Sequence, residues 1–371
     1  MTDPATLLRA ANDQIKAGNH QEAKPLIDQL VVMAPTSAQV LCTAAITDLA
    51  LGLIESGVDR LARALSLDPT LSNGTQIKEQ ALALAFNRAV AAHNGHDVDD
   101  ARTLYRAVLR LDPSCTAAAK NLALLERCAA PEKLFTVGVT TFDKRFEVFL
   151  KPLLEKIKES APDIEVVICV NGNNGEPFNE NYRKEFLHFC AEHKNTFPIV
   201  FTEFRSLARM WNSIIVNASH DHILLLNDDV TISDGRLFPM TAQAVLTHDC
   251  SLKLNNSWSH VLLKREEIDV IGYFDERLLG IGEEDTDMEY RYERQYGYAP
   301  RWIECPYIVN EFSSIRQDNV RPGIGKYSAF NREFLLKVKY DMTKEVADRM
   351  ISPSERLYPY ERFFWENKHK I

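Results

Sequence analysis

Strands and helices alternate along the middle of this 371-residue chain, and the alternation constrains its fold more than any other feature. Short runs rich in β-branched and aliphatic residues are separated by segments with the 3.6-residue periodicity of helices. The expected strands are 134–141, 164–170, 199–201 and 221–226, and the expected helices between them are 145–160, 179–193 and 207–218. This order predicts a largely parallel sheet with right-handed crossover helices.

The stretch from Asp221 to Val230 contains the central strand of this pattern. Four consecutive hydrophobic residues lead to Asn227-Asp228-Asp229, so a buried strand would deliver two carboxylates to its carboxyl end. Open α/β sheets bind ligands at that edge, and hard divalent cations prefer carboxylate oxygens. The stretch therefore predicts a ligand or metal site, although a polar strand end followed by a turn would give the same residues.

Composition narrows the class of protein. With 45% hydrophobic and 26% charged residues, the chain is an ordinary globular protein with room for two domains. No run approaches the roughly 18 apolar residues of a membrane span, and the acidic start is unlike a signal peptide. The seven cysteines form no close pair, which favours a reducing cytoplasm over a zinc site or disulfide framework. A net charge of −9 argues against a general nucleic-acid binder.

The first third of the chain carries an internal repeat. Three apolar-periodic segments end at Pro35, Pro69 and Pro113, which are separated by 34 and 44 residues. Thirty-four is the tetratricopeptide period, and the extra residues, near 71–80, predict a longer first helix or a loop. We expect three helix pairs and a closing helix over 114–128, each pair burying its apolar face on the next. Such a solenoid would bind a protein partner or would only pack on the neighbouring domain.

Two common phosphate-binding loops are excluded by spacing. The residues after the first strand, Thr140 to Arg145, lack the glycines of a dinucleotide site. The segment 171–175 follows the second strand but lacks the third glycine, and Pro322 to Ser328 does not have the spacing of a P-loop. At best, the segment 171–175 is a turn whose amides face a nucleotide.

The second part of the chain resembles the GT-A class of nucleotide-sugar glycosyltransferases, particularly its large inverting family. The resemblance covers about 134–311. It is carried by Thr140-Thr141 with Arg145, by Asn171-Gly172-Asn173, by Ser206 to Asn212, by Asn227-Asp228-Asp229, and by the block from Ser259 to Arg291 that contains Glu283-Glu284-Asp285. The pairing of an acidic strand end with a later Glu-Glu-Asp is the most discriminating part.

The resemblance implies a role for each matched residue. Contacts to the donor and its nucleotide fall on Thr140, Thr141, Arg145, Asn171, Asn173, Ser206, Arg209, Asn212, Asn227 and Asp228. Contacts to the acceptor or sugar fall on Trp258, His260 and Glu283. A divalent cation, Mn²⁺ or Mg²⁺, would be held by Asp229 and Asp228.

The same resemblance implies a mechanism. The cation would stabilise the leaving diphosphate, and Asp285 would act as general base on the acceptor hydroxyl. Glu284 would orient the acceptor, while Gly280 and Gly282 would let their loop close and exclude water. A single displacement inverts the anomeric centre.

Departures from the family pattern leave alternatives open. Asn227 replaces the first acid of the D-x-D motif, and no histidine lies between Asp285 and His369, so Asn310, Glu311, diphosphate or water would complete the metal shell. The runner-up hypothesis is a tetratricopeptide adaptor with an inactive, GT-A-like nucleotide-binding domain. A metal-dependent phosphohydrolase would also use clustered acids.

Structural roles compete with two of these assignments. Residues 283–287 would also serve as the acidic first turn of a helix, where they complement the helix dipole. Trp258 would also serve as a core residue.

Taken together, the sequence predicts an all-α tetratricopeptide-like domain (1–130), a GT-A α/β domain (131–330) and a helical, aromatic extension (331–371). The extension would pack on the catalytic domain, or its tail 357–370 would touch a membrane surface. The expected donor is a nucleoside-diphosphate sugar, with a UDP-sugar favoured, and the acceptor is a glycan, a lipid-linked molecule or a protein. The expected location is the cytoplasm, including the inner face of the membrane.

Overall fold

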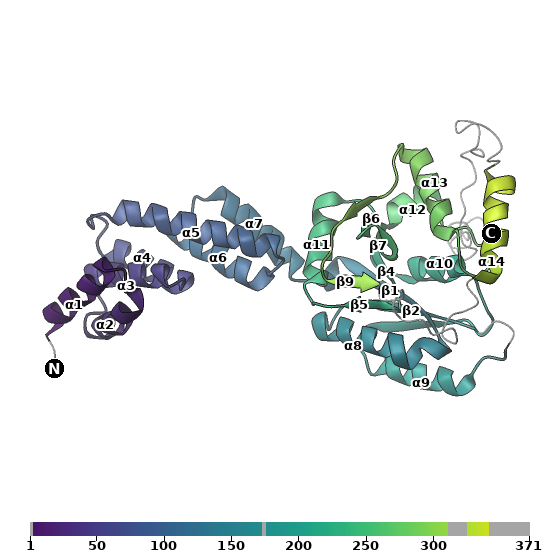
Figure 1. The fold of residues 1–371 in the computed structure, drawn as a ribbon, viewed down its shortest axis with the longest axis horizontal. Coiled ribbons are helices and arrows are strands. Elements are labelled where there is room, and N and C mark those ends of the chain that lie inside the picture. The colour runs from purple at the N-terminus through teal and green to yellow at the C-terminus, as the bar shows by residue number, and fades with distance from the viewer. Residues whose placement is uncertain (1–2, 173–175, 311–324, 341–371) are drawn as a thin grey trace, which may run out of the picture. The chain divides into compact units, whose positions relative to one another are not determined.

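The computed structural model describes residues 3–172, 176–310 and 325–340. The chain divides into two compact units, Met1–Ala129 and Ala130–Ile371, whose helices and strands are labelled in Figure 1. Three features singled out in the sequence lie outside the described residues: Asn173, Glu311 and the aromatic tail 357–370.

Seven helices make up residues 3–129 of the first unit. They are α1 (Pro4–Lys16), α2 (His20–Met33), α3 (Ala38–Ala50), α4 (Ile54–Leu67), α5 (Gly74–Asn94), α6 (Val98–Leu111) and α7 (Thr116–Cys128). The first six pack as consecutive pairs, and each pair also packs on the next. The predicted solenoid of three pairs and a closing helix is confirmed.

Local sequence explains where these helices begin and end. The side chains of Asp3, Ser37 and Asp97 accept hydrogen bonds from the first turns of α1, α3 and α6. Gly18 and Gly52 follow α1 and α3 with φ of +79° and +77°, a conformation that suits glycine. The extra residues of the third pair lengthen its first helix, because α5 has 21 residues where α1 and α3 have 13 each.

One buried carboxylate links the first helix pair to the second. Asp48 of α3 has no exposed surface. Lys24 of α2 and Arg60 of α4 lie 3.3 and 3.0 Å from its two oxygens, and Ser56 Oγ donates a hydrogen bond at 2.6 Å. These partners offset the cost of removing the carboxylate from water.

A mostly parallel sheet of seven strands is the centre of the described part of the second unit. Its order is β3 (Thr196–Val200), β2 (Val166–Asn171), β1 (Phe135–Phe142), β4 (His222–Asn227), β7 (Ser257–Lys264), β6 (Leu252–Leu254) and β8 (Arg301–Ile303). Only β7 runs against its neighbours within this sheet. β5 (Val230–Ile232) and β9 (Ile308–Asn310) form a separate antiparallel pair.

Helices cover both faces of this sheet. Figure 1 shows α8 (Lys151–Ser160) and α9 (Glu180–Ala191) on one side, and α10 (Leu207–Asn217), α12 (Arg265–Ile271) and α13 (Glu284–Tyr296) on the other. The remaining elements are the 3₁₀ turns η1 (Pro131–Lys133) and η2 (Asp143–Arg145), the π-helical turns η3 (Phe146–Leu150) and η5 (Phe334–Lys339), and helices α11 (Leu237–His248) and α14 (Gly325–Glu333). The predicted architecture, helical repeats followed by an α/β domain with a mostly parallel sheet, is confirmed.

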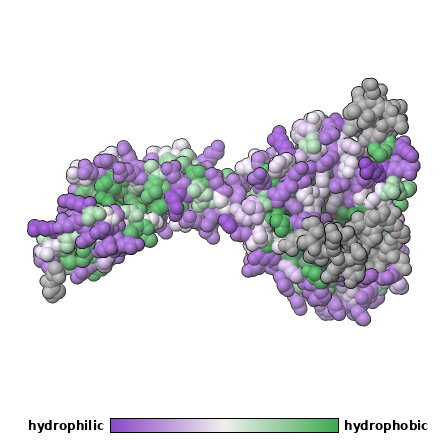
Figure 2. Space-filling view, in the orientation of Figure 1, coloured by the Kyte–Doolittle hydropathy of each residue, from purple (hydrophilic) through white to green (hydrophobic). Residues whose placement is uncertain are grey.

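The surface of the first unit keeps some large apolar side chains. Val32, Leu53, Leu67 and Leu84 are between 39% and 81% exposed, and Figure 2 shows hydrophobic residues among polar ones on the visible face of this unit. In residues 3–172, 176–310 and 325–340, no helix combines the length and the apolarity that crossing a membrane requires.

Candidate functional site

Three neighbouring strands end at one edge of the sheet and bring predicted donor-side residues together. Thr140 of β1 pairs with Asn227 of β4, and Phe142 of β1 pairs with Asn171 of β2. The two acids 228–229 follow β4 directly. Because these strands are parallel, their carboxyl ends lie at the same edge, which is where open α/β sheets bind ligands.

Arg145, which follows β1, binds both acids. Its Nε donates to Asp228 Oδ2 at 3.0 Å, and one terminal nitrogen lies 2.7 Å from Asp228 Oδ1 and 3.0 Å from Asp229 Oδ2. Thr141 Oγ1 donates to Asp228 Oδ2 at 2.7 Å. We call Thr141, Arg145, Asp228 and Asp229 the Arg145 cluster. All four side chains are buried, so their charges act on one another with little screening by water.

The two acids of the Arg145 cluster differ in whether all their carboxylate oxygens have hydrogen-bond partners. Both oxygens of Asp228 are bonded, and burial raises the pKa of its carboxyl to about 6, although Arg145 and Thr141 act to lower it. Asp229 is 7% exposed, and its Oδ1 has no hydrogen-bond partner among the described residues. An unpaired buried carboxylate oxygen is uncommon and costly. Asp229, rather than Asp228, is the acid with an oxygen ready for a cation or ligand.

His260 supplies a second unpaired atom. It lies on β7 opposite Leu226 of β4, is 2% exposed, and places Nδ1 2.9 Å from Ser259 Oγ. Burial lowers the pKa of the ring to about 4, against the opposing effect of Asp229, so the ring is neutral near pH 7. Its Nε2 has no partner in the part of the chain that the structure describes. When the ring proton is on Nδ1, Nε2 can accept a hydrogen bond.

Asn171 and Ser206, two residues predicted to contact the sugar donor, hold the loop ahead of α10. The amide of Asn171 donates to the carbonyl of Arg205 and accepts from its N–H, both at 2.8 Å. Ser206 caps α10 by accepting a hydrogen bond from the N–H of Arg209 at 3.3 Å. Their nucleotide contacts stay predictions, while their contribution to the shape of this edge is visible.

Arg209 and Asn212 lie on α10 and are also predicted to contact the sugar donor. Both bind the loop after α12. Asn212 is 1% exposed and exchanges hydrogen bonds with the backbone of Phe274, at 2.9 and 3.0 Å. It also donates to Glu276 Oε1 at 2.8 Å, and Arg209 donates to the other oxygen of Glu276 at 2.8 Å. The sequence did not single out Glu276. The available signals were its acidic character and its place in the block from Ser259 to Arg291.

Three acids, 283–285, stand at the start of α13. The preceding loop is left-handed at both of its glycines, and Glu283 also has a positive φ of +72°, which is strained for a residue with a Cβ. Asp285 is half-buried, and its Oδ1 accepts a hydrogen bond from the N–H of Thr286 at 2.8 Å. Its assignment as a base stays a prediction.

Glu284 is turned back on its own loop. Its Oε2 accepts a hydrogen bond from the N–H of Gly282 at 2.6 Å, and the residue is 5% exposed. Burial raises the pKa of this carboxyl to about 7, and the neighbouring Asp285 raises it further. The predicted acceptor contact is not tested by this arrangement, which shows Glu284 as a residue that holds the loop.

Glu284→Gln is expected to remove a pH dependence of stability. The folded pKa of about 7 lies above the unfolded value of 4.5, so the unfolded chain loses this proton first and stability falls as pH rises through that window. The full difference is on the order of 3 kcal/mol. Thermal melts should show the variant equal to the wild type near pH 4.5 and more stable above pH 7. The exposed Glu293→Gln on the same helix is the control, and parallel curves for wild type and Glu284→Gln would contradict the assignment.

Trp258 of β7 is half-buried and packs against the hydrophobic core. Its Nε1 donates to Glu289 Oε1 at 2.9 Å, and its ring meets that of Phe274 edge-on, with 6.1 Å between the ring centroids. Lys253 also binds Glu289, at 2.6 Å. These contacts account for the tryptophan as a packing residue, and its stacking on a sugar stays a prediction.

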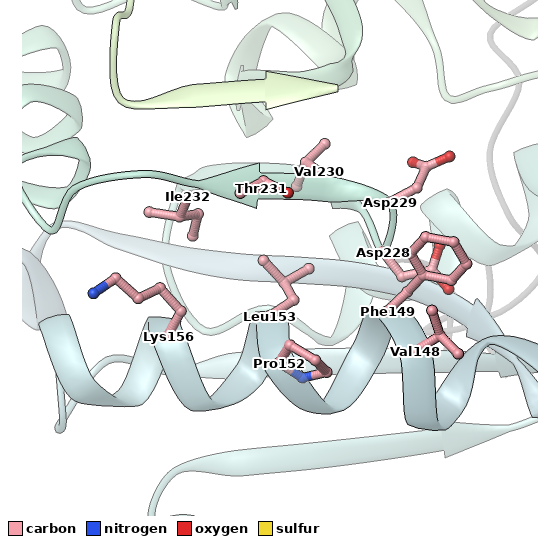
Figure 3. A pocket seen from close by; sticks show the side chains of 10 residues that line it. All are labelled: Val148, Phe149, Pro152, Leu153, Lys156, Asp228, Asp229, Val230, Thr231 and Ile232. Atoms are coloured by element: carbon pink, nitrogen blue, oxygen red, sulfur yellow. The ribbon is translucent and has the colours of Figure 1, made fainter. Parts of the chain in front are cut away.

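A cavity of about 270 Å³ opens beside the two acids. Figure 3 shows Asp228 and Asp229 at one end, Lys156 at the other, and apolar side chains of α8 and β5 between them. Its lining is Val148, Phe149, Pro152, Leu153, Lys156, Asp228, Asp229, Val230, Thr231 and Ile232. The Arg145 cluster can therefore be approached from the α8 side.

The divalent cation stays a prediction, and the described side chains show which groups are free to hold it. Within residues 3–172, 176–310 and 325–340, no three His, Cys, Asp or Glu side chains gather as a ready metal site. Asn310 pairs with Val230 in the small sheet. The unpaired Oδ1 of Asp229 fits a cation that takes few ligands from the protein and the rest from a diphosphate.

Comparisons with known proteins give limited likenesses. No protein-family model and no curated protein matches the chain. Solved structures similar to it include S. aureus TarS 1–349 in complex with UDP, at 14% identity over 46% of this chain and 57% of that chain, with a TM-score of 0.36. MamA is similar at 17% identity over 33% of this chain and 66% of that chain, with a TM-score of 0.21.

A third similar structure is the first TPR of Spaghetti (RPAP3) bound to an HSP90 peptide. It shares 17% identity over 34% of this chain and 93% of that chain, with a TM-score of 0.20. The chain spans only 35% of a longer TarS structure and just under two thirds of MamA. The architecture described above, helical repeats followed by an α/β domain, stands on the structure of the chain itself.

Proposed function

We propose that the second unit is a glycosyltransferase that moves a sugar from a nucleoside-diphosphate donor to a hydroxyl group, with inversion. One observation carries the proposal. The Arg145 cluster lies at the carboxyl edge of β1 and β4 and contains a buried oxygen, Asp229 Oδ1, without a partner among the described residues. This edge is the ligand-binding edge of open α/β sheets.

On the donor side, Asp229 would hold a divalent cation, Mn²⁺ or Mg²⁺. When bound, the cation neutralises charge on the leaving diphosphate. Arg145 offers a second positive charge at the same place, and guanidinium groups match phosphate geometry. Thr140 and Asn227 would contact the nucleotide from the paired ends of β1 and β4, and His260 Nε2 would accept a hydrogen bond from a hydroxyl of the donor sugar.

On the acceptor side, Asp285 would remove the proton of the attacking hydroxyl. The acceptor oxygen then bonds to the anomeric carbon, and the nucleoside diphosphate leaves with the electron pair. Attack from the face opposite the leaving group inverts the anomeric centre. Glu283 would contact the acceptor from the same helix start.

The acceptor would be a glycan, a lipid-linked molecule or a protein, recruited in part by the first unit. The exposed Val32, Leu53 and Leu67 of the solenoid suit a protein partner. We place the reaction in the cytoplasm, at the inner face of the membrane where the acceptor is lipid-linked.

Calorimetry and a transfer assay on the full chain test the proposal. Calorimetry first measures the binding of UDP in the presence of Mn²⁺. A panel of sugar nucleotides is then compared by protection against thermal unfolding, because a ligand bound to the folded state raises its stability. We expect one nucleoside-diphosphate sugar to bind and its sugar to appear on an acceptor, detected by mass spectrometry. Release of inorganic phosphate without an acceptor would indicate a hydrolase instead.

A second candidate, a non-catalytic adaptor, is favoured by one contact. Arg145 already pairs with both acids of the Arg145 cluster, so the fold itself supplies a positive charge at the place proposed for the cation. This candidate predicts no transfer with any donor, and an absence of heat with every nucleoside diphosphate would favour it over the transferase.

A further inference from the structure

The loop 275–283, which leads into the predicted catalytic acids, is held from two sides. On one side the N–H of Leu207, the first residue of α10, donates to the carbonyl of Gly280 at 2.8 Å. On the other side lie α14 and η5. A buried cluster joins the loop to η5 through Leu278, Leu335 and Tyr340.

Asn331 of α14 supplies hydrogen bonds that the loop cannot make within itself. Its amide nitrogen donates to the carbonyls of Leu279 and Gly282, and its oxygen accepts from the N–H of Leu279, all at 2.8 Å. The side chain has no exposed surface. Because an unpaired buried backbone group is costly, removing this amide would leave the loop without partners for three polar groups.

The two glycines of the loop allow α14 to come this close. A Cβ at Gly280 would lie 2.3 Å from the ring of Tyr327, and one at Gly282 would lie 3.0 Å from Ser328 Oγ. Both glycines also have positive φ, +58° and +123°, which glycine adopts without strain. The sequence alone suggested glycines that let the loop move, whereas the structure shows glycines that let a helix pack on it.

Lys339 of η5 joins the start of the loop to α13. Its Nζ lies 2.8 Å from Asp275 Oδ2 and 2.5 Å from Asp287 Oδ1. Tyr340 Oη donates to Asp287 Oδ1 at 2.6 Å, and Arg291 lies 2.9 Å from Asp287 Oδ2. Both carboxylates are fully buried. Asp287 stands two residues after the predicted base, so this ion pair fixes the first turn of α13.

We propose that residues 325–340 act as a brace that holds the loop 275–283 in its left-handed conformation and so sets the position of Asp285. Asn331 and Lys339 are positioning residues, since they reach the loop and the first turn of α13 rather than a substrate. The effect on catalysis rests on the proposed function. The brace itself concerns only contacts within the chain.

The brace differs from a helix that packs only for stability. A stabilising helix would bury apolar side chains, and its loss would lower the melting temperature without selectively loosening one loop. Here, beside the apolar cluster of Leu278, Leu335 and Tyr340, the polar contacts of Asn331 and Lys339 converge on the loop backbone and on the first turn of α13. Since a displacement of about 1 Å can lower a rate roughly a hundredfold, small movements of this loop would act on Asp285.

Hydrogen–deuterium exchange and transfer kinetics on the full chain test the brace. Asn331→Ala is compared with the wild type and with Lys337→Ala, an exposed change in the same segment. We expect amides of 276–287 in Asn331→Ala to exchange at least about tenfold faster. We expect kcat to fall about a hundredfold, while the affinity for UDP stays within about twofold of wild type. Lys337→Ala should match the wild type in all three.

Each outcome decides the proposal. Unchanged exchange in 276–287 overturns the brace whatever the activity, and faster exchange with unchanged kcat overturns the positioning role. If the wild type transfers no sugar from any donor, the proposed function fails, and the exchange data still decide the brace. Should Asn331→Ala not fold by circular dichroism, Lys339→Met takes its place with the same expectations.

Discussion

Asp285→Asn is expected to lower sugar transfer by roughly 100- to 10,000-fold, the usual contribution of a general base. Asparagine has nearly the same shape and keeps an oxygen for the N–H of Thr286, which Asp285 binds at 2.8 Å, but it cannot take a proton from the acceptor hydroxyl. Affinity for UDP should not change, because the side chain acts on the acceptor. Single-turnover kinetics with saturating donor, together with calorimetry of UDP binding, measure the two effects separately.

Glu293→Gln is the matched control for this substitution. It makes the same change from carboxylate to amide on an exposed position of the same helix, α13, so it should leave transfer as in the wild type. Full transfer by Asp285→Asn would remove this residue from the mechanism. A parallel loss of UDP binding would show that the substitution disturbs the donor site as well.

Asp229→Asn is expected to weaken Mn²⁺-dependent binding of UDP by at least about a hundredfold, since changes even in the outer shell of a metal site cost 10- to 100-fold. The substitution removes the charge at Oδ1, the carboxylate oxygen that has no partner in the described chain. The fold should persist, because Arg145 keeps Asp228 as its main partner, at 2.7 and 3.0 Å. Calorimetry of UDP with and without Mn²⁺ gives the size of the metal effect.

Asp234→Asn is the control for charge alone. It lies beyond β5 and pairs with Arg236 at the surface, so the enhancement of UDP binding by Mn²⁺ should be the same as in the wild type. An equal enhancement in Asp229→Asn would mean that the cation is held elsewhere. The absence of any enhancement in the wild type would mean that the nucleotide binds without a cation. In the second case Arg145 would be the positive charge that faces the diphosphate.

The sequence predicted most of the framework, because each element left a local signal. Proline at the ends of the repeats marked the helix pairs. The hydrophobic run of β4 marked a buried strand, and its last residues had to lie at the ligand-binding edge. Here the periodicity of apolar residues and the parallel topology were enough.

The use made of individual polar side chains was not predictable in the same way. Asn171 and Asn212 could face a nucleotide or a backbone group, and the structure shows each of them bonded to a neighbouring loop. An amide side chain offers the same donors and acceptors to either partner. Which partner the amide binds depends on the position of the neighbouring loop, and no local sequence pattern indicates that position.

The brace was hidden for a related reason. Asn331 binds Leu279 and Gly282, residues that precede it by 52 and 49 positions, and nothing in the sequence between them indicates the contact. The boundary expected at 331 also falls inside α14, which begins at Gly325. Long-range contacts through single polar residues leave no periodicity.

A crystal structure of the full chain with UDP and Mn²⁺ tests the central claim most directly. The account predicts an anomalous manganese signal next to Asp229 Oδ1, the diphosphate beside Arg145, and the carboxylate of Asp285 across a sugar-sized space from the diphosphate. Nucleotide density away from the carboxyl edge of β1 and β4, or Asp285 facing a different cavity from Asp229, would contradict it.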